Sequence, residues 1–219
     1  MNYGQCNCKI PRDLIVSRGA LEQGYAAVAM IRRELGSVEC SIYLAGDVGK
    51  NVSDFCIVPE QICYWSLTHI TAEGVVKAQE TAIAEGKELK AWAHIHPAGY
   101  NDFSAIDYCG MDTLLAQTET FFRVGQSDVQ GIGALLFVPD RRPYAEFAFW
   151  LDCDKRVRTR GRLVVVESGN GLPVYFSEPK QGSKDKGEEI KEMLAQYALG
   201  IDLPLIDSKN LPCRSGLYG

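Results

Sequence analysis

Apolar residues recur with two different periods along most of the chain. Between residues 18 and 35 they return every three or four positions, which is typical of an amphipathic helix. Ser17 precedes this run as an N-cap, and Gly36 follows it as a glycine stop. Residues 38–46 are rich in strand-forming side chains and end at a glycine, so they predict a strand.

The same two signals repeat through the middle of the chain. We predict strands at 55–58, 89–95, 131–138 and 144–151, and helices at 73–86 and 104–122. Helices that interleave with strands indicate an α/β or α+β fold, in which helices pack on a central sheet.

The alternation weakens after Asp152. We interpret residues 153–219 as a C-terminal hairpin-plus-helix extension that packs on the main domain. Its predicted parts are a hairpin formed by 163–166 and 174–176 with its turn at 169–171, a polar linker at 180–187, and a helix that stops at Gly200.

Composition is that of an ordinary folded protein. The 219 residues are 46% hydrophobic and 23% charged, which suffices for a good-sized domain with a core of normal size. A formal net charge of −5 counts against a nucleic-acid-binding surface, which normally carries a basic excess. We interpret the locally basic run at 155–162 as a solvated linker or strand edge, with a binding patch as the alternative.

We expect the protein neither to cross a membrane nor to be exported by an ordinary signal. The N-terminal residues lack the apolar segment of a signal peptide, and no stretch of about 18 apolar residues occurs. The eight cysteines include no Cys-x-x-Cys pair and are expected to be reduced thiols of a cytoplasmic protein. Cys6 and Cys8 are a further metal-binding candidate, although no partner pair lies nearby.

The chemistry of the chain centres on His94 and His96. Strand residues two apart point to the same side, with their Cα atoms about 6–7 Å apart, so two imidazoles can converge on one cation. The alternative is two polar residues on a solvent-facing strand. The metal interpretation is favoured by the apolar residues before the pair, by Pro97 immediately after it, and by Asp107, which returns in the first turn of a helix. Two histidines and one acid leave a fourth position open, as in catalytic zinc sites.

Ser104-Ala105-Ile106-Asp107 also has a purely structural interpretation. A serine followed three positions later by an acid is close to a capping box that opens a helix. Both interpretations can hold together, because a helix N-terminus is a rigid place to mount a ligand and a hydroxyl donor.

These residues resemble the signature of the JAMM (MPN+) metallopeptidases, His-x-His-Pro-x6-Ser-x-x-Asp. His94-Ile95-His96-Pro97, six residues, and then Ser104-Ala105-Ile106-Asp107 match it. The family also carries an upstream glutamate before an apolar run and a glycine, and Glu39 fits this place. Residues 55–61 resemble the next strand of the family, which often ends in a Pro-x-Gln turn. The resemblance covers residues 14–152; Ile95 and Ser41 depart from residues that are common in the family.

The resemblance implies an MPN-type fold, with a central mixed sheet flanked by helices, and a zinc-dependent peptidase. The family typically cuts isopeptide bonds at the C-terminus of ubiquitin or ubiquitin-like proteins, which would be the partners here. His94, His96 and Asp107 would bind Zn²⁺, and Glu39 would act as general base and acid. Ser104 would donate a hydrogen bond to the tetrahedral oxyanion.

Other functions stay open at this stage. A peptidase of the same fold could act on cell-wall peptides or on a sulfur-carrier protein. A non-catalytic MPN scaffold would be expected to have lost ligands, and a nucleic-acid-associated module conflicts with the acidic balance. His69 is interpreted as a structural or surface residue. The segment 61–74, with Tyr64 and Trp65, is either a substrate contact or a hydrophobic anchor.

Overall fold

A computed structural model describes residues 12–97, 100–116, 131–138, 142–152, 155–167, 174–200 and 203–206. Its helices are α1 (Arg18–Leu35), α2 (Ala72–Ala84), α3 (Ala105–Ala116) and α5 (Lys184–Ala198). Its strands are β1 (Asp13–Ser17), β2 (Cys40–Asp47), β3 (Val52–Ser53), β4 (Phe55–Val58), β5 (Gln61–Cys63), β6 (Thr68–Ile70), β7 (Lys87–Ile95), β8 (Gly131–Phe137), β9 (Tyr144–Asp152), β10 (Lys155–Val166), β11 (Tyr175–Phe176) and β12 (Lys180–Gln181). The predicted mixed α/β class is confirmed.

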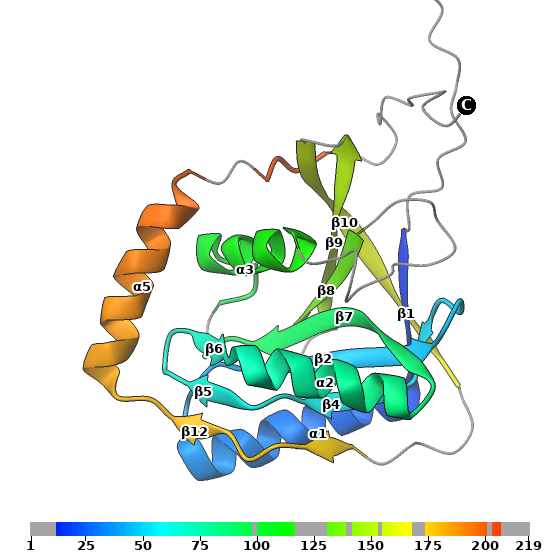
Figure 1. Cartoon of the computed structure of the whole chain (residues 1–219), viewed down its shortest axis with the longest axis horizontal. Helices are drawn as coiled ribbons and strands as arrows, with labels where there is room; N and C mark the ends of the chain where they lie inside the picture. Colours follow the sequence, from blue (N-terminus) through cyan, green and yellow to red (C-terminus); the bar gives the residue numbers. More distant parts are fainter. Residues whose placement is uncertain are drawn as a thin grey trace, which may run out of the picture.

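A large mixed sheet organises these elements and curls strongly across the molecule (Figure 1). Its strands run in the order β11-β4-β2-β7-β8-β9-β10-β1-β3. Strand β7 lies inside the sheet, antiparallel to β2 and parallel to β8. A second, small sheet contains β12, β5 and β6.

Both faces of the sheet are buried, and β7 contributes to both cores. Ala91 and Ala93 pack in the core that includes α1, whereas Trp92 packs in the core that includes α2 and α3. Successive strand residues point to opposite faces, so His94 and His96 share the side of Trp92. The strand period therefore directs both histidines toward α3.

The local signals at the ends of α1 are confirmed. The Oγ atom of Ser17 accepts a hydrogen bond from the amide of Ala20 at 3.1 Å, and Gly36 ends the helix with a φ of 83°. The other strands and helices predicted up to residue 152 also form, with bounds that shift by a few residues. The predicted helical residues 117–122 lie outside the described residues.

The predicted C-terminal hairpin is wrong. Residues 163–166 end the long strand β10, which is antiparallel to β9 and parallel to β1. Residues 175–176 form β11, which pairs with β4 at the opposite end of the strand order. Both runs therefore find partners far away in the sequence, while the turn predicted at 169–171 lies outside the described residues. The predicted boundary after residue 152 falls between two paired strands of one sheet.

The basic run at 155–162 is a strand and not a linker. It belongs to β10 and pairs with β9 along one side. Three of its four arginines form ion pairs with carboxylates of other elements: Arg156 with Asp112 at 2.6 Å, Arg158 with Glu146 at 3.0 Å, and Arg162 with Asp13 at 2.9 Å.

The segment predicted as a polar linker, 180–187, is also ordered structure. Its first two residues form β12, and Ser183 caps α5 by accepting a hydrogen bond from the amide of Lys186. Gly182 and Gly187 pack so closely on the ring of Tyr64 that a Cβ atom would lie 1.9 Å and 2.8 Å from it. These contacts explain why a run of small and polar residues is held in place.

Two further findings concern the helices and the cysteines. None of the described helices is long and apolar enough to cross a membrane. Cys40, Cys56, Cys63 and Cys109 are buried free thiols, and the remaining cysteines lie outside the described residues.

The pair of Glu146 and Arg158 gives a test of the core. Glu146 is 1% exposed and also accepts a hydrogen bond from the hydroxyl of Tyr144 at 2.6 Å. Glu146→Gln should lower the free energy of unfolding by about 3 kcal/mol, because it leaves Arg158 without its counter-charge. Asp13→Asn breaks the pair with Arg162, whose side chain is 73% exposed, and should cost less than about 1 kcal/mol. Equal losses in urea unfolding would contradict this difference.

Candidate metal centre

The candidate site lies where β7 ends and α3 begins. His94 is held inside the sheet by pairing with Ser41 on β2 and Leu136 on β8. His96 follows the last residue of β7, and Pro97, which has no amide hydrogen, cannot continue the ladder. The chain then returns to the same place through Asp107 in the first turn of α3.

The capping box predicted for this turn is confirmed. The amide of Asp107 donates to the Oγ atom of Ser104 at 3.2 Å, and the amide of Ser104 donates to Oδ2 of Asp107 at 2.6 Å. The reciprocal bonds satisfy two amides that the start of a helix leaves unpaired. They also fix the carboxylate of Asp107 in the direction of the strand.

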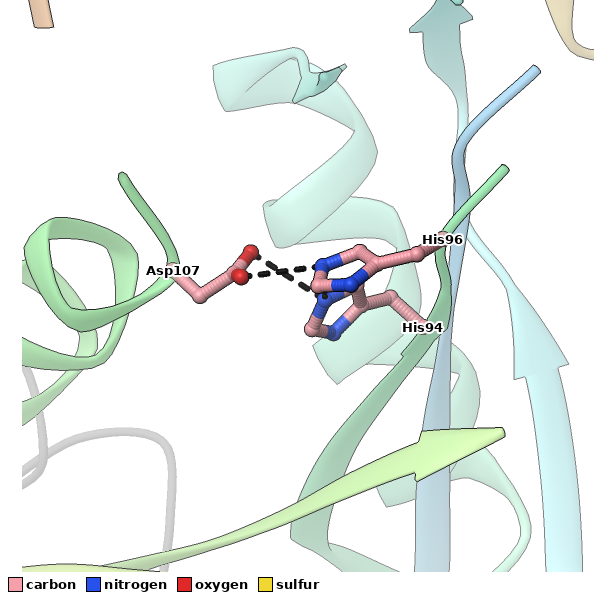
Figure 2. A group of neighbouring side chains, drawn as sticks. All are labelled: His94, His96 and Asp107. Carbon is pink, nitrogen blue, oxygen red and sulfur yellow. Dashed lines mark hydrogen bonds and ion pairs between the residues drawn. The ribbon is translucent and has the colours of Figure 1, made fainter. Parts of the chain in front are cut away.

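Three buried side chains converge on one point, as Figure 2 shows. The Nε2 atoms of His94 and His96 are 3.0 Å apart. Nε2 of His96 lies 3.0 Å from Oδ2 of Asp107, and Nε2 of His94 lies 3.1 Å from Oδ1. The residues are only 1%, 4% and 6% exposed, so the sequence-predicted ligands are brought together in the interior.

These distances fit a metal ion. A tetrahedral ion bonded at about 2.0–2.1 Å would hold two ligand atoms about 3.3 Å apart. The two histidine nitrogens, and each nitrogen and its neighbouring carboxylate oxygen, are within a few tenths of an ångström of that separation. Nδ1 of His94 is buried and has no hydrogen-bond partner among the described residues, which leaves Nε2 as the ring atom with polar neighbours. His94, His96 and Asp107 therefore form a buried group that could bind a metal ion.

The electrostatics favour an ionised acid at the centre. Burial opposes ionisation of Asp107, but the charges and hydrogen bonds of His94 and His96 lower its pKa well below the usual range. Burial likewise disfavours the charged form of His96, yet the hydrogen bond and charge of Asp107 give a net rise in the pKa of His96. Metal binding here would compete with protonation of His96, because a metal-bound imidazole nitrogen must be deprotonated.

Glu39 lies beside this group, immediately before β2. Cys40 pairs with Ile95 in antiparallel register, so continuing the register by one residue sets Glu39 opposite His96. Its amide donates to the carbonyl of Tyr64 at 2.8 Å, which anchors its backbone. Burial, followed by the negative charge of Asp107, raises the pKa of Glu39 to about 8.

Gln61 fixes the strand that carries Glu39. Its side-chain amide accepts a hydrogen bond from the amide of Ser41 and donates one to the carbonyl of Ser41, both at 2.8 Å. The glutamine of the Pro-x-Gln turn seen in the sequence therefore holds β2 in place through this bidentate contact. Ser41 itself is buried and uses its backbone here, and Ile95 is buried in the core.

An aromatic lining surrounds the histidines. The indole of Trp92 stacks on His94 with ring centroids 4.4 Å apart and an interplanar angle of 15°, and Phe103 packs on the same ring at 5.4 Å. Tyr100 is 72% exposed and presents its ring to His96 at 6.3 Å. These residues were not singled out from the sequence; the period-two relation of Trp92 to His94 was the one signal available.

The other residues considered in the sequence are His69, the segment 61–74 and the cysteine pair Cys6 and Cys8. His69 is exposed on β6, in agreement with the surface interpretation. Tyr64 is buried and anchors the segment 61–74, while Trp65 is 44% exposed. Cys6 and Cys8 lie outside the described residues.

Comparisons with known proteins leave the chemistry of the site as the main guide. No family model matches the chain, and no curated protein matches it. Among solved structures, the solution structure of protein DSY2949 from Desulfitobacterium hafniense is similar at 14% identity and a TM-score of 0.40. The similarity covers 70% of this chain and 93% of that one. A likeness of this size assigns no function.

Removal of one ligand should abolish tight metal binding. We predict that His96→Ala weakens the affinity for Zn²⁺ by more than about 100-fold, because even changes next to a ligand cost about 10–100-fold. His69→Ala, which removes an exposed histidine on β6, should leave the affinity unchanged. Elemental analysis after dialysis and competition with a chromophoric chelator measure both variants. Undiminished stoichiometric metal in His96→Ala would refute the site.

Proposed function

We propose that this protein is a zinc-dependent metallopeptidase of the JAMM type, which hydrolyses peptide or isopeptide bonds. The observation that carries the proposal is the buried convergence of His94, His96 and Asp107 with Glu39 beside it. A resident metal, a base and a hydroxyl donor are the parts that amide hydrolysis requires.

Zinc suits the donor set of the site. Two imidazole nitrogens and one carboxylate are frequent ligands of catalytic zinc, with a fourth position left for water or substrate. Zinc, when bound, supplies Lewis acidity that polarises a carbonyl and lowers the pKa of water toward neutrality. His94, His96 and Asp107 would hold it, and the capping box keeps Asp107 aimed at the site.

Glu39 is the proposed general base and acid. The rise in the pKa of Glu39 to about 8 reflects burial beside Asp107, and a nearby dication would favour the ionised form again. A carboxylate balanced between these influences can take a proton from water and pass it to the leaving amine. The bond from its amide to Tyr64 keeps the side chain beside the site.

Ser104 is the proposed donor to the oxyanion. Its Oγ atom accepts one bond, from the amide of Asp107. A hydroxyl that accepts a bond retains its hydrogen for donation. Ser104 can therefore cap α3 and donate to a developing negative charge at the same time.

The proposed substrate is a conjugate of ubiquitin or a ubiquitin-like protein, cut after its C-terminal Gly-Gly. The ligands are 6% exposed or less, so a chain must approach them closely. Glycine has no side chain and permits such an approach. Buried free thiols agree with the reducing cytoplasm in which such conjugates occur.

The substrate class is tested by offering two amides to the zinc-loaded protein. We expect cleavage of a Gly-Gly-linked ubiquitin-like conjugate that a chelator abolishes and zinc restores. A cell-wall peptide containing D-amino acids should stay intact. Chelator-sensitive cleavage of the wall peptide alone would favour the other peptidase class, and cleavage of neither substrate would count against the proposed activity.

Loss of Glu39 should separate metal binding from turnover. Glu39→Gln keeps the size of the side chain and removes the base, so turnover should fall by about 100-fold or more while zinc affinity is retained. Glu34→Gln changes an exposed glutamate of α1 and serves as the matched control. Cleavage rates at saturating substrate, with zinc content measured in parallel, decide the matter. Near-normal turnover in Glu39→Gln would exclude it as the base.

A further inference from the structure

The C-terminal segment 180–187 packs on the turn whose backbone holds Glu39. The amide of Glu39 donates to the carbonyl of Tyr64 at 2.8 Å, and the amide of Tyr64 donates to the carbonyl of Leu67 at 2.9 Å. The side chain of Tyr64 is buried, and a Cβ atom on Gly182 would lie 1.9 Å from its ring. The turn that bonds to Glu39 is therefore in direct contact with the C-terminal segment.

Hydrogen bonds fix this segment in place. The amide of Gly182 donates to the carbonyl of Cys63 at 2.9 Å, which extends the parallel pairing of β12 with β5. Nε2 of Gln181 donates to the carbonyl of Leu35, the last residue of α1, at 3.0 Å. The segment therefore links the end of α1, from which the chain runs on to Glu39, with β5, from which it runs on to Tyr64 (Figure 1).

The first turn of α5 makes a second contact with the same ring. Gly187 is buried there, and a Cβ atom on it would lie 2.8 Å from Cδ1 of Tyr64. Gly182 and Gly187 thus both lie too close to the ring for a methyl group. The ring of Tyr64 is held between the backbone that follows β12 and the backbone of α5.

We propose that Tyr64 is a positioning residue for Glu39 and that the segment 180–187 is a clamp that holds Tyr64 in place. The proposal rests on the proposed function, because it concerns the position of the base of that same site. Glu39 continues the register in which Cys40 pairs with Ile95, and its bond to Tyr64 fixes the backbone at this point. A misplacement of about 1 Å can lower a rate by about 100-fold, so the clamp has a large effect available to it.

The alternative is that the clamp stabilises the fold and does nothing else. Loss of the clamp would then lower the free energy of unfolding and leave kcat of the folded protein unchanged. A positioning contact instead lowers kcat of the folded protein. It leaves zinc affinity unchanged, because the candidate ligands are held by β7 and by the cap of α3.

The experiment compares Gly182→Ala with Gly200→Ala in the full chain. Gly182→Ala drives a methyl group into the ring of Tyr64, whereas a Cβ atom on Gly200, two residues after α5, meets nothing closer than 3.5 Å. Both zinc-loaded variants are tested on the Gly-Gly-linked ubiquitin-like conjugate, well below the temperature at which they unfold. We expect Gly182→Ala to lower kcat by about 10–100-fold at unchanged zinc affinity, and Gly200→Ala to behave as the wild type.

Hydrogen exchange reports the position of Glu39 without any turnover. The amide of Glu39 should exchange about ten-fold faster or more in Gly182→Ala, because its bond to Tyr64 opens more often. The amide of Asp107, which is bonded to Ser104, serves as the internal control. It should exchange at the same rate in the wild type and in the variant.

Two further variants keep the test decisive if Gly182→Ala does not fold. Gly187→Ala brings a methyl group less close to the ring, and alanine favours the helix more than glycine does. A fall in kcat in this variant therefore comes from the ring contact and not from a weaker helix. Tyr64→Phe retains the ring and should retain kcat.

The outcomes separate the clamp from the proposed function. Cleavage by the wild type with normal kcat in Gly182→Ala and Gly187→Ala overturns the clamp and leaves the metallopeptidase proposal standing. A fall in kcat with unchanged exchange at Glu39, or with an equal loss of zinc affinity, also overturns the clamp. Zinc binding without cleavage by the wild type overturns the proposed function, and the positioning role falls with it.

Discussion

The rest of the site depends on the hydrogen bonds and ion pairs of the buried carboxylate of Asp107. An ionised acid that is 6% exposed costs several kcal/mol unless it is paired and hydrogen-bonded. The amide of Ser104 and the imidazoles of His94 and His96 meet that requirement. Because these partners come from a helix cap and from a strand, satisfying one side chain fixes the position of α3 relative to β7.

The same carboxylate has two roles that the sequence alone does not separate. A capping box requires an acid three positions after the serine, and the metal site requires an acid that faces the strand. Both requirements fall on Asp107, since the first turn of α3 faces the end of β7. The capping prediction is confirmed by hydrogen bonds, and it supports the metal interpretation, because a capped first turn limits the directions that the carboxylate can take.

Local features of the fold could be predicted from the sequence, and features that depend on distant partners could not. Ser17, Gly36 and the apolar periods define α1 and the main strands without any knowledge of the tertiary structure. The hairpin failed because the end of β10 pairs with β1, whose Asp13 lies 149 positions before Arg162. A turn signal between two apolar runs carries no information about such a partner.

In the candidate site, too, the local features could be predicted from the sequence and the contacts with distant residues could not. His94, His96 and Asp107 lie within one short stretch, so the strand period and the capping pattern together predict their convergence. Glu39 was identified through the family resemblance, and the antiparallel register supplies the physical reason for its position. The packing of Gly182 and Gly187 on Tyr64 could not be found in this way, because it depends on contacts that only the folded chain creates.

Two separate supports hold the parts of the site. The candidate metal ligands are held by β7 and by the cap of α3, whereas Glu39 is held by its neighbour β2, by Gln61 and by the turn at Tyr64. The second support continues into β12 and α5 through two glycines that leave room for the tyrosine ring. A change in the C-terminal segment would therefore reach Glu39 before it reached the candidate metal ligands. The positions of the three candidate ligands and of Glu39 can therefore vary independently, because different contacts hold them.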